Sequence, residues 1–319
     1  MEPSITPMTQ LDSPDLSVVI PTYNRHELLR LALATLLRQS SANLTCEVLV
    51  VDNNSTPETR AVVDELVQTD SRLRYVRETR QGNAHARNTG VVHARAPIIA
   101  FLDDDVAVRD NWLEMISSSF KETNADFIGG KVLPRWETPP PSWLTVSNWA
   151  PIAALEYGDA SFEITADNPL CLLTANIAFK KEVFAEYGGF SPAVQRVGNT
   201  IGSLEDHEFL MRLLRAGLSG LYVPKMIVDA YVGSDRMTKD YHRRWHQGHG
   251  RFYAIMKDKE WEHSKFQVAG VPSHLFREAA SQTAIWIKRI LTGATDAAFE
   301  SECRLRFFYG FLSERQKQS

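Results

Sequence analysis

The sequence lacks a hydrophobic run that could cross a bilayer, because no stretch reaches the roughly 18 to 20 uninterrupted apolar residues of a spanning helix. Cysteine is also scarce. Cys46, Cys171 and Cys303 are far apart and without CxxC spacing, which argues against a disulfide framework and a zinc knuckle. With a formal net charge of −4, the chain has no basic field that would favour nucleic acid. We therefore expect a cytoplasmic protein without a nucleic-acid partner.

The first 15 residues lack the apolar core of a signal peptide, and we expect residues 1–15 to form a flexible leader. From residue 16 onwards, short apolar runs alternate with segments in which apolar residues recur at helical spacing. Four such pairs follow one another, at 16–21 and 24–39, 46–52 and 57–68, 72–78 and 82–94, and 97–104 and 111–120. This order predicts an α/β fold with a mainly parallel sheet covered on both faces.

Polar residues follow three of the predicted strands, with the sequences PTYN at 21–24, DNN at 52–54 and DDD at 103–105. In an open parallel sheet the carboxyl ends of the strands share one edge, where ligands bind. Three adjacent carboxylates repel one another, so some must be solvated, hydrogen-bonded or bound to a cation such as Mg²⁺ or Mn²⁺. A solvated turn, with Asp110 as the N-cap of the next helix, is the alternative.

A second acidic cluster lies at the start of a helix predicted over residues 204–216. Ser203 suits the N-cap and Asp206 the N3 position of a capping box, and acidic residues suit the first helical turn. By helical spacing, Glu205 falls on a charged stripe, whereas Asp206 falls on the opposite, apolar side with Phe209. We therefore expect Asp206 to point inward, where a carboxylate is a natural general base.

Five stretches resemble a known family in their order and separation: SVVIPTYNR, VVDNNST, GNAHARNTG, FLDDDV and EDHEF. Together they are similar to family 2 glycosyltransferases, whose GT-A fold is a Rossmann-like nucleotide-binding fold. In this chain we expect additional helices after that fold, at the C-terminal end. The resemblance implies a nucleotide-sugar-binding half at residues 16–133, an acceptor-side half with the catalytic base at 134–235, and a C-terminal helical region at 236–319.

The resemblance also implies roles in donor binding. Thr22 and Tyr23 would flank the nucleobase, Asp52 would hydrogen-bond it, and Arg87 would support the same pocket. The other residues that it assigns to the donor are Pro21, Arg25, Asn54 and Asp104.

Three further aspartates would carry the chemistry. Asp103 would contact ribose or metal, Asp105 would hold Mn²⁺ or Mg²⁺ on the diphosphate, and Asp206 would take the proton of the acceptor hydroxyl in an inverting displacement. Many relatives carry a late histidine that completes the metal shell, but here Tyr231 stands in its place with Asp229 nearby. The third protein ligand is therefore open between Asp229, a downstream histidine and water.

For the acceptor side, several assignments have a structural alternative. Asn176 could contact the acceptor or lie in a packed strand, and Trp136 or Trp143 could stack on a sugar or fill a core. The remaining candidates for acceptor or diphosphate contact are Glu205, Arg243, Arg244 and His246, against the alternative of a solvated basic helix face for the last three.

The predicted function is metal-dependent, inverting transfer of a sugar, with a UDP-sugar as the expected donor and a glycan or lipid-linked acceptor. The alternatives are a sugar-nucleotide-binding protein without turnover and a transferase that glycosylates protein. Nucleotidyl transfer is disfavoured because the chain has no glycine-rich phosphate loop. The C-terminal helices either pack against the domain or contact a membrane peripherally. The sequence does not specify the oligomeric state.

Overall fold

The computed structural model describes residues 13–39, 44–196, 201–257, 262, 264, 266–268 and 270–318. Most of the expected leader at residues 1–15 therefore lies outside the described residues. Within them, no helix is long and apolar enough to span a membrane.

The first part of the chain alternates strands and helices as predicted. Its strands are β1 (Leu16–Thr22), β2 (Cys46–Asp52), β3 (Leu73–Arg77) and β4 (Ile98–Leu102), and its helices are α1 (His26–Leu36), α2 (Pro57–Val67), α3 (Asn83–His93) and α4 (Trp112–Glu122). A short strand that the sequence did not predict, β5 (Val106–Val108), follows the aspartates. Asn111 rather than Asp110 stands at the N-cap position of α4, with a left-handed φ of 63°.

The second part adds strands β6 (Phe127–Trp136), β7 (Phe162–Ile164), β8 (Asn176–Lys180) and β9 (Gly220–Val232). Its helices are α5 (Glu182–Tyr187) and α6 (Glu205–Arg215), with 3₁₀ turns η1 (Val146–Asn148), η2 (Ala150–Ile152), η3 (Pro192–Val194) and η4 (Ser234–Met237). Strand β9 is the longest of these strands, with 13 residues. The predicted cap at Ser203 is wrong, because Leu204 occupies the N-cap position of α6 and makes no side-chain cap.

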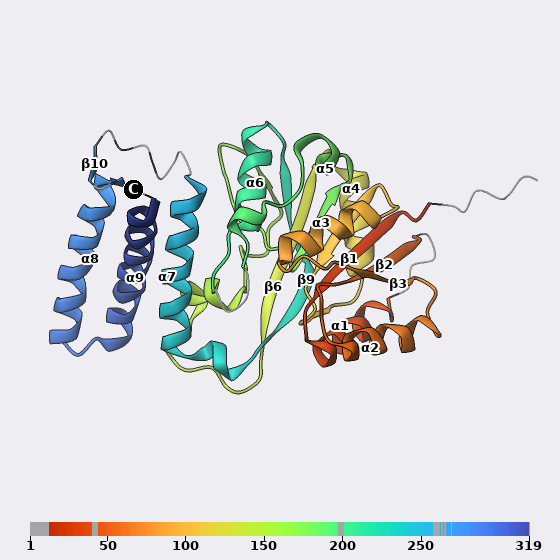
Figure 1. Ribbon diagram of the computed structural model, residues 1–319, viewed down its shortest axis with the longest axis horizontal. Helices are drawn as coiled ribbons and strands as arrows, with labels where there is room; N and C mark the ends of the chain where they lie inside the picture. Colours follow the sequence, from red (N-terminus) through yellow and green to blue (C-terminus); the bar gives the residue numbers. More distant parts are fainter. Residues whose placement is uncertain are drawn as a thin grey trace, which may run out of the picture.

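All strands from β1 to β9 belong to one sheet, in the order β3-β2-β1-β4-β8-β6-β9-β5, with β7 also paired to β9 (Figure 1). Strands β1 to β4 are mutually parallel, as predicted. Strand β8 is antiparallel to both of its neighbours and joins the two parts of the chain into one sheet. The amino end of β8 therefore lies at the edge of the sheet where the parallel strands end.

Two hydrophobic cores lie on the two faces of the sheet, because successive side chains of a strand point to opposite sides. In β1, Val18 and Ile20 join one core with α1, α2 and α4, whereas Val19 joins the other with α3, α5 and α6. The second core contains a group of contacting phenylalanine rings, Phe101, Phe179, Phe184, Phe190 and Phe209. Phe209 belongs to α6, so this packing fixes the start of α6 against the sheet.

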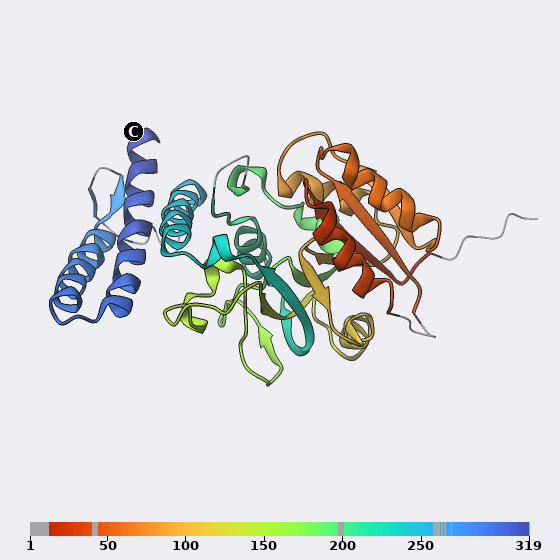
Figure 2. The same ribbon diagram turned by 90° about the horizontal axis from the view of Figure 1, so that it is seen from below.

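The C-terminal helices α7 (Lys239–Met256), α8 (Ser273–Leu291) and α9 (Thr295–Gln318) stand side by side at one end of the molecule, and a second view agrees (Figures 1 and 2). A two-stranded ribbon of β10 (Gln267–Val268) and β11 (Val271–Pro272) precedes α8. Glycines allow α7 and α9 to pack closely. A Cβ on Gly250 would lie 2.0 Å from the carbonyl oxygen of Phe307, and one on Gly310 would lie 1.9 Å from that of Gln247.

Candidate active site

The polar strand ends meet at one edge of the sheet, as the sequence predicted. Thr22 at the end of β1 pairs in register with Asp52 at the end of β2. Its hydroxyl donates a hydrogen bond of 2.7 Å to Oδ2 of Asp104, which follows β4. The loop after β1 is also tied to the loop after β2, because Asn24 accepts from the backbone of Thr56 and donates its own N–H to Ser55.

The aspartates at residues 103–105, here called the triple aspartate, are mostly buried, and Arg25 partly neutralises the last two of them. Nη1 of Arg25 lies 2.9 Å from Oδ2 of Asp105 and 3.3 Å from Oδ1 of Asp104. Burial raises the pKa of Asp104 to about 7, although the Arg25 guanidinium opposes the shift and the neighbouring carboxylates add to it. Burial likewise raises the pKa of Asp105. This cluster is therefore short of positive charge.

The residues predicted to bind the nucleobase are only partly presented to a ligand. The ring of Tyr23 is 48% exposed at the strand edge and is free to stack on a base. In contrast, Asp52 is 1% exposed, and its carboxylate already accepts hydrogen bonds from the Ser55 backbone and the Tyr75 hydroxyl. Asp52 shapes the loop in this structure, and its contact with a base stays a prediction. Asn54 accepts a 3.0 Å hydrogen bond from Nη2 of Arg77.

Arg87 on α3 is surrounded by carboxylates. Its side chain is only 3% exposed, and it contacts three carboxylates from distant parts of the chain. Nη2 lies 3.3 Å from Oδ1 of Asp103, while Nη1 lies 3.0 Å from Oε1 of Glu205 and 3.3 Å from Oδ1 of Asp206. Arg87 therefore joins the triple aspartate to the start of α6, and its support of a nucleobase pocket stays a prediction.

Asp206 is held in one orientation but still reaches solvent. Its carboxylate accepts hydrogen bonds of 3.0 Å from the Thr174 backbone and 2.9 Å from the Thr174 hydroxyl, in addition to the contact with Arg87. Its side chain is 21% exposed. Such a carboxylate is well placed to accept a proton from a hydroxyl group that enters the site. No motif in the sequence points to Thr174, whose contribution depends on the loop before β8.

Glu205 corrects the helical-spacing argument. The sequence predicted that it lies on an outer stripe, but it is buried beside Arg87. Burial raises the pKa of Glu205, the neighbouring Asp206 raises it further, and Arg87 opposes both. Buried in this way, Glu205 supports Arg87 and does not face an acceptor.

Asn176 lies in a packed strand, which was the alternative to contact with an acceptor. It is fully buried at the start of β8. Its side chain accepts a 2.8 Å hydrogen bond from Nε1 of Trp112 and donates two of 2.8 Å to the backbone carbonyls of Lys131 and Met226. These bonds tie three segments of the sheet beneath the site.

The tryptophan region of residues 136–149 packs against the C-terminal helices. Trp136, Trp143 and Trp149 cover a small apolar cluster that includes Val232. The ring of Trp143 makes edge contacts with His242 of α7 and with a phenylalanine of α9, at centroid distances of 4.8 and 5.1 Å. The core alternative therefore holds for Trp143.

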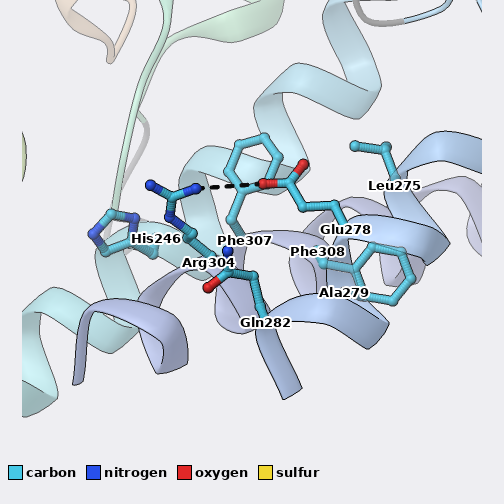
Figure 3. A pocket seen from close by; sticks show the side chains of 8 residues that line it. All are labelled: His246, Leu275, Glu278, Ala279, Gln282, Arg304, Phe307 and Phe308. Atoms are coloured by element: carbon cyan, nitrogen blue, oxygen red, sulfur yellow. Dashed lines mark ion pairs between the residues drawn. The ribbon is translucent and has the colours of Figure 1, made fainter. Parts of the chain in front are cut away.

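The basic residues of α7 are engaged away from the triple aspartate. Arg243 forms an ion pair of 2.7 Å with Glu302 of α9, and the exposed Arg244 pairs with Asp240 one turn earlier. His246 lines a cavity of about 260 Å³ between α7, α8 and α9, where Glu278 and an arginine of α9 form an ion pair (Figure 3). The predicted diphosphate contacts of these residues are not supported by this arrangement.

His246 is also unsuited to an anion for electrostatic reasons. Burial lowers the pKa of its imidazole to about 4, so the ring is neutral near pH 7. A neutral imidazole offers a phosphate no positive charge.

Arg236, which sequence reasoning missed, is the cationic side chain that does reach the triple aspartate from the second part of the chain. Its Nη1 lies 3.9 Å from Oδ2 of Asp105. It belongs to η4, directly after β9, and β9 contacts the triple aspartate because the Tyr231 N–H donates to the carbonyl of Asp105. Asp229, a candidate third metal ligand, forms an ion pair of 2.7 Å with Arg109.

The charge balance of the site fits a divalent cation. Five carboxylates, those of residues 103–105, 205 and 206, face three guanidiniums, those of residues 25, 87 and 236. When all are ionised, two negative charges stay uncompensated. Among the described residues, no three His, Cys, Asp or Glu side chains converge as a metal site. Two carboxylates suit Mg²⁺ or Mn²⁺, which complete their shells with water and phosphate oxygens.

Residues 17–188, more than half of the chain, match the model of glycosyl transferase family 2. The protein therefore belongs to glycosyl transferase family 2. The fold agrees: the mannosyltransferase of Pyrobaculum calidifontis, solved with GDP-Man and Mn²⁺, superposes with a TM-score of 0.61 at 19% identity over 95% of this chain and 87% of that chain. The architecture is that of the GT-A glycosyltransferases.

Curated relatives share the first part of the chain. Glycosyltransferase AglE of Haloferax volcanii is 35% identical over 120 residues, which is 37% of this chain and 40% of that protein. A UDP-Glc:alpha-D-GlcNAc-diphosphoundecaprenol beta-1,3-glucosyltransferase of Escherichia coli is 36% identical over 116 residues, covering 36% and 44% of the two chains. The matches thus span less than half the length of these relatives.

Proposed function

We propose that this protein is a divalent-cation-dependent, inverting glycosyltransferase that moves a sugar from a nucleotide-diphosphate sugar to a hydroxyl group. The observation that carries the proposal is the position of Arg87, which contacts Asp103 at 3.3 Å and Asp206 at 3.3 Å. A candidate cation site and a candidate base therefore lie on either side of one guanidinium. A sugar bound between them would be within reach of both.

In the proposed reaction the acceptor oxygen attacks the anomeric carbon while the bond to the diphosphate oxygen breaks. Asp206 takes the proton of the attacking hydroxyl, and Thr174 and Arg87 hold its carboxylate in the required orientation. A cation on Asp103 and Asp105 would offset the negative charge that develops on the departing nucleoside diphosphate.

For the donor, we propose a UDP-sugar. The name of the Escherichia coli relative specifies UDP-Glc, and the exposed ring of Tyr23 offers a stacking surface for a base. The proposed acceptor is a glycan, attached to a lipid carrier, because the same relative is named for a diphosphoundecaprenol-linked sugar.

A lipid carrier would require the protein to work at a membrane surface, for which we propose the cytoplasmic face. The end of α8 supports contact with a membrane surface. Leu291 is 81% exposed, and Ile287 and Ile290 are also exposed beside Lys288 and Arg289. Aliphatic side chains next to cationic ones suit an anionic headgroup layer. Co-sedimentation with phosphatidylglycerol vesicles should fall for the double variant Ile290→Ser/Leu291→Ser, and unchanged binding would contradict this contact.

The proposal is tested by a thermal-shift and calorimetric panel of UDP, GDP, dTDP and their common sugars, each with Mn²⁺, with Mg²⁺ and with EDTA. We expect one nucleotide to raise the melting temperature only when a cation is present. Asp105→Asn should remove the effect of the cation, whereas Asp229→Asn, on a carboxylate paired with Arg109, should keep it. A response that persists in EDTA would contradict the role of the cation. Binding without any transfer or donor hydrolysis would indicate a protein that binds sugar nucleotides without turnover.

A further inference from the structure

One oxygen of the triple aspartate faces two guanidiniums. Oδ2 of Asp105 lies 2.9 Å from Nη1 of Arg25 and 3.9 Å from Nη1 of Arg236. The two arginines come from distant parts of the chain, because Arg25 precedes α1 and Arg236 lies in η4 after β9. Asp105 is also the residue proposed to hold the cation. A cation and these two side chains therefore compete for the same carboxylate.

Among the described residues, Arg25 pairs with two carboxylates and Arg236 with one, whereas Arg87 pairs with three. The Arg25 side chain is 43% exposed, and its hydrogen bonds among the described residues go to Asp104 and Asp105. Nε of Arg236 is buried and has no hydrogen-bond partner in the part of the chain that the structure describes. An unpaired buried donor is costly and is commonly satisfied by a ligand.

A nucleotide-sugar would provide what both side chains lack. A diphosphate carries several anionic oxygens, which match the planar fork of a guanidinium with two parallel hydrogen bonds. A divalent cation arriving at Asp105 would repel the two guanidiniums, and the diphosphate that it carries would offer them new partners at the same place.

We propose that Arg25 and Arg236 neutralise Asp105 in the free protein and pass to the donor diphosphate when a divalent cation takes their place. This inference rests on the proposed function. Its consequence is strong coupling between the two ligands. The cation alone binds weakly because it displaces two guanidiniums from a carboxylate, whereas the cation together with a nucleoside diphosphate binds well because the guanidiniums keep anionic partners. By linkage, each ligand then raises the affinity for the other by the same factor.

The test measures Mn²⁺ binding by the electron paramagnetic resonance signal of free Mn²⁺, first alone and then with UDP, GDP or dTDP. The variants are Arg25→Gln and Arg236→Gln. The control is Arg30→Gln, which removes an arginine of α1 whose ion pair with Glu65 lies on the surface.

For Arg25→Gln we expect Mn²⁺ alone to bind at least 5-fold tighter, while the Mn²⁺-dependent affinity for the nucleoside diphosphate falls at least 10-fold. Arg236→Gln should change both quantities in the same directions, with a smaller effect on Mn²⁺ alone because Arg236 is farther from Asp105. Arg25→Lys should restore the weak binding of Mn²⁺ alone but not the diphosphate affinity, since an ammonium lacks the guanidinium fork. The control should match the wild type.

Changes of both affinities in one direction, or no change in either, would overturn the inference and leave the two arginines as structural partners of the carboxylates. Far-ultraviolet circular dichroism and the melting temperature of each variant separate such a result from a loss of folding. If the wild-type protein binds Mn²⁺ with none of the three nucleotides, the proposed function fails as well. If the wild-type protein binds Mn²⁺ together with a nucleotide but the arginine variants do not show the expected changes, only the inference fails.

Discussion

The site contains two acidic clusters, and they are neutralised in different ways. Within the triple aspartate, Asp104 and Asp105 pair with Arg25, whose side chain is 43% exposed, and Asp105 lies more distantly from Arg236. Glu205 and Asp206 pair with Arg87, whose side chain is 3% exposed and is surrounded by carboxylates. The first arrangement can exchange partners without disturbing the core, whereas the second cannot.

The two clusters therefore differ in whether they are built during folding or left open to exchange partners. A buried ion pair is costly to form and still more costly to break, because removal of one partner leaves a buried charge. The start of α6 is therefore a fixed element. A half-exposed ion pair contributes little to stability and is easily replaced. The donor side of the site is accordingly the side that we expect to rearrange.

The largest effect is expected from Asp206→Asn, which removes the proposed base while preserving the shape of the side chain at the start of α6. The amide oxygen can still accept from Thr174, so the loop should keep its position. The rate of transfer should fall about 10²–10⁴-fold, the usual contribution of general base catalysis. Cation-dependent nucleotide binding should stay within 2-fold, measured by calorimetry. Turnover at the wild-type rate would show that the base lies elsewhere.

Next in size is the difference between Arg87→Met and Arg25→Met, which tests the comparison directly. Arg87→Met leaves Glu205 buried without a cation and should lower the free energy of unfolding by about 3 kcal/mol. Arg25→Met should lower it by less than Arg87→Met does, because the Arg25 side chain is 43% exposed, although its partners Asp104 and Asp105 are largely buried. Urea unfolding at pH 7.5 measures both values. Equal losses would mean that the two clusters do not differ in the way described.

The smallest effect on activity is expected from variants of the hydrogen bonds beneath the site. Asn176→Ala removes three buried hydrogen bonds beneath the site and should cost about 2 kcal/mol of unfolding free energy. The matched variant Trp112→Phe removes only one of these bonds, so the part of the unfolding free energy that is lost with hydrogen bonds should be smaller. Neither should change the Michaelis constant for the acceptor more than about 2-fold. A selective rise of that constant in Asn176→Ala would restore the acceptor role that burial argues against.

The fold and the edge that carries the site could be predicted because both depend on local pattern. Apolar runs and helical spacing specified β1 to β4 and their helices, and strand topology then brought Thr22 and Asp104 together. Roles that depend on a distant partner could not be predicted. Helical spacing predicted that Glu205 lies on an outer face, because spacing within one helix carries no information about Arg87, which packs against that face.

The same reason explains the errors in the C-terminal region. Arg243 carries the positive charge that an anion site needs, but it pairs with Glu302, which lies on a helix far along the chain. Arg236 carries no local motif, and its importance arises only because β9 ends beside Asp105. Unpaired charges in a sequence are thus poor guides to function until their tertiary partners are known.

The link between the first two loops has a consequence for the thermodynamics of recognition. Asn24, with a left-handed φ of 53°, joins the loop after β1 to Ser55 and Thr56 after β2. Ordering a flexible loop on binding would cost roughly 1–2 kcal/mol of conformational entropy per residue. Here that loss would accompany folding of the chain, so the proposed nucleobase would meet two loops that are already joined. The unfavourable entropy of donor binding should therefore come mainly from the sugar and diphosphate end of the ligand.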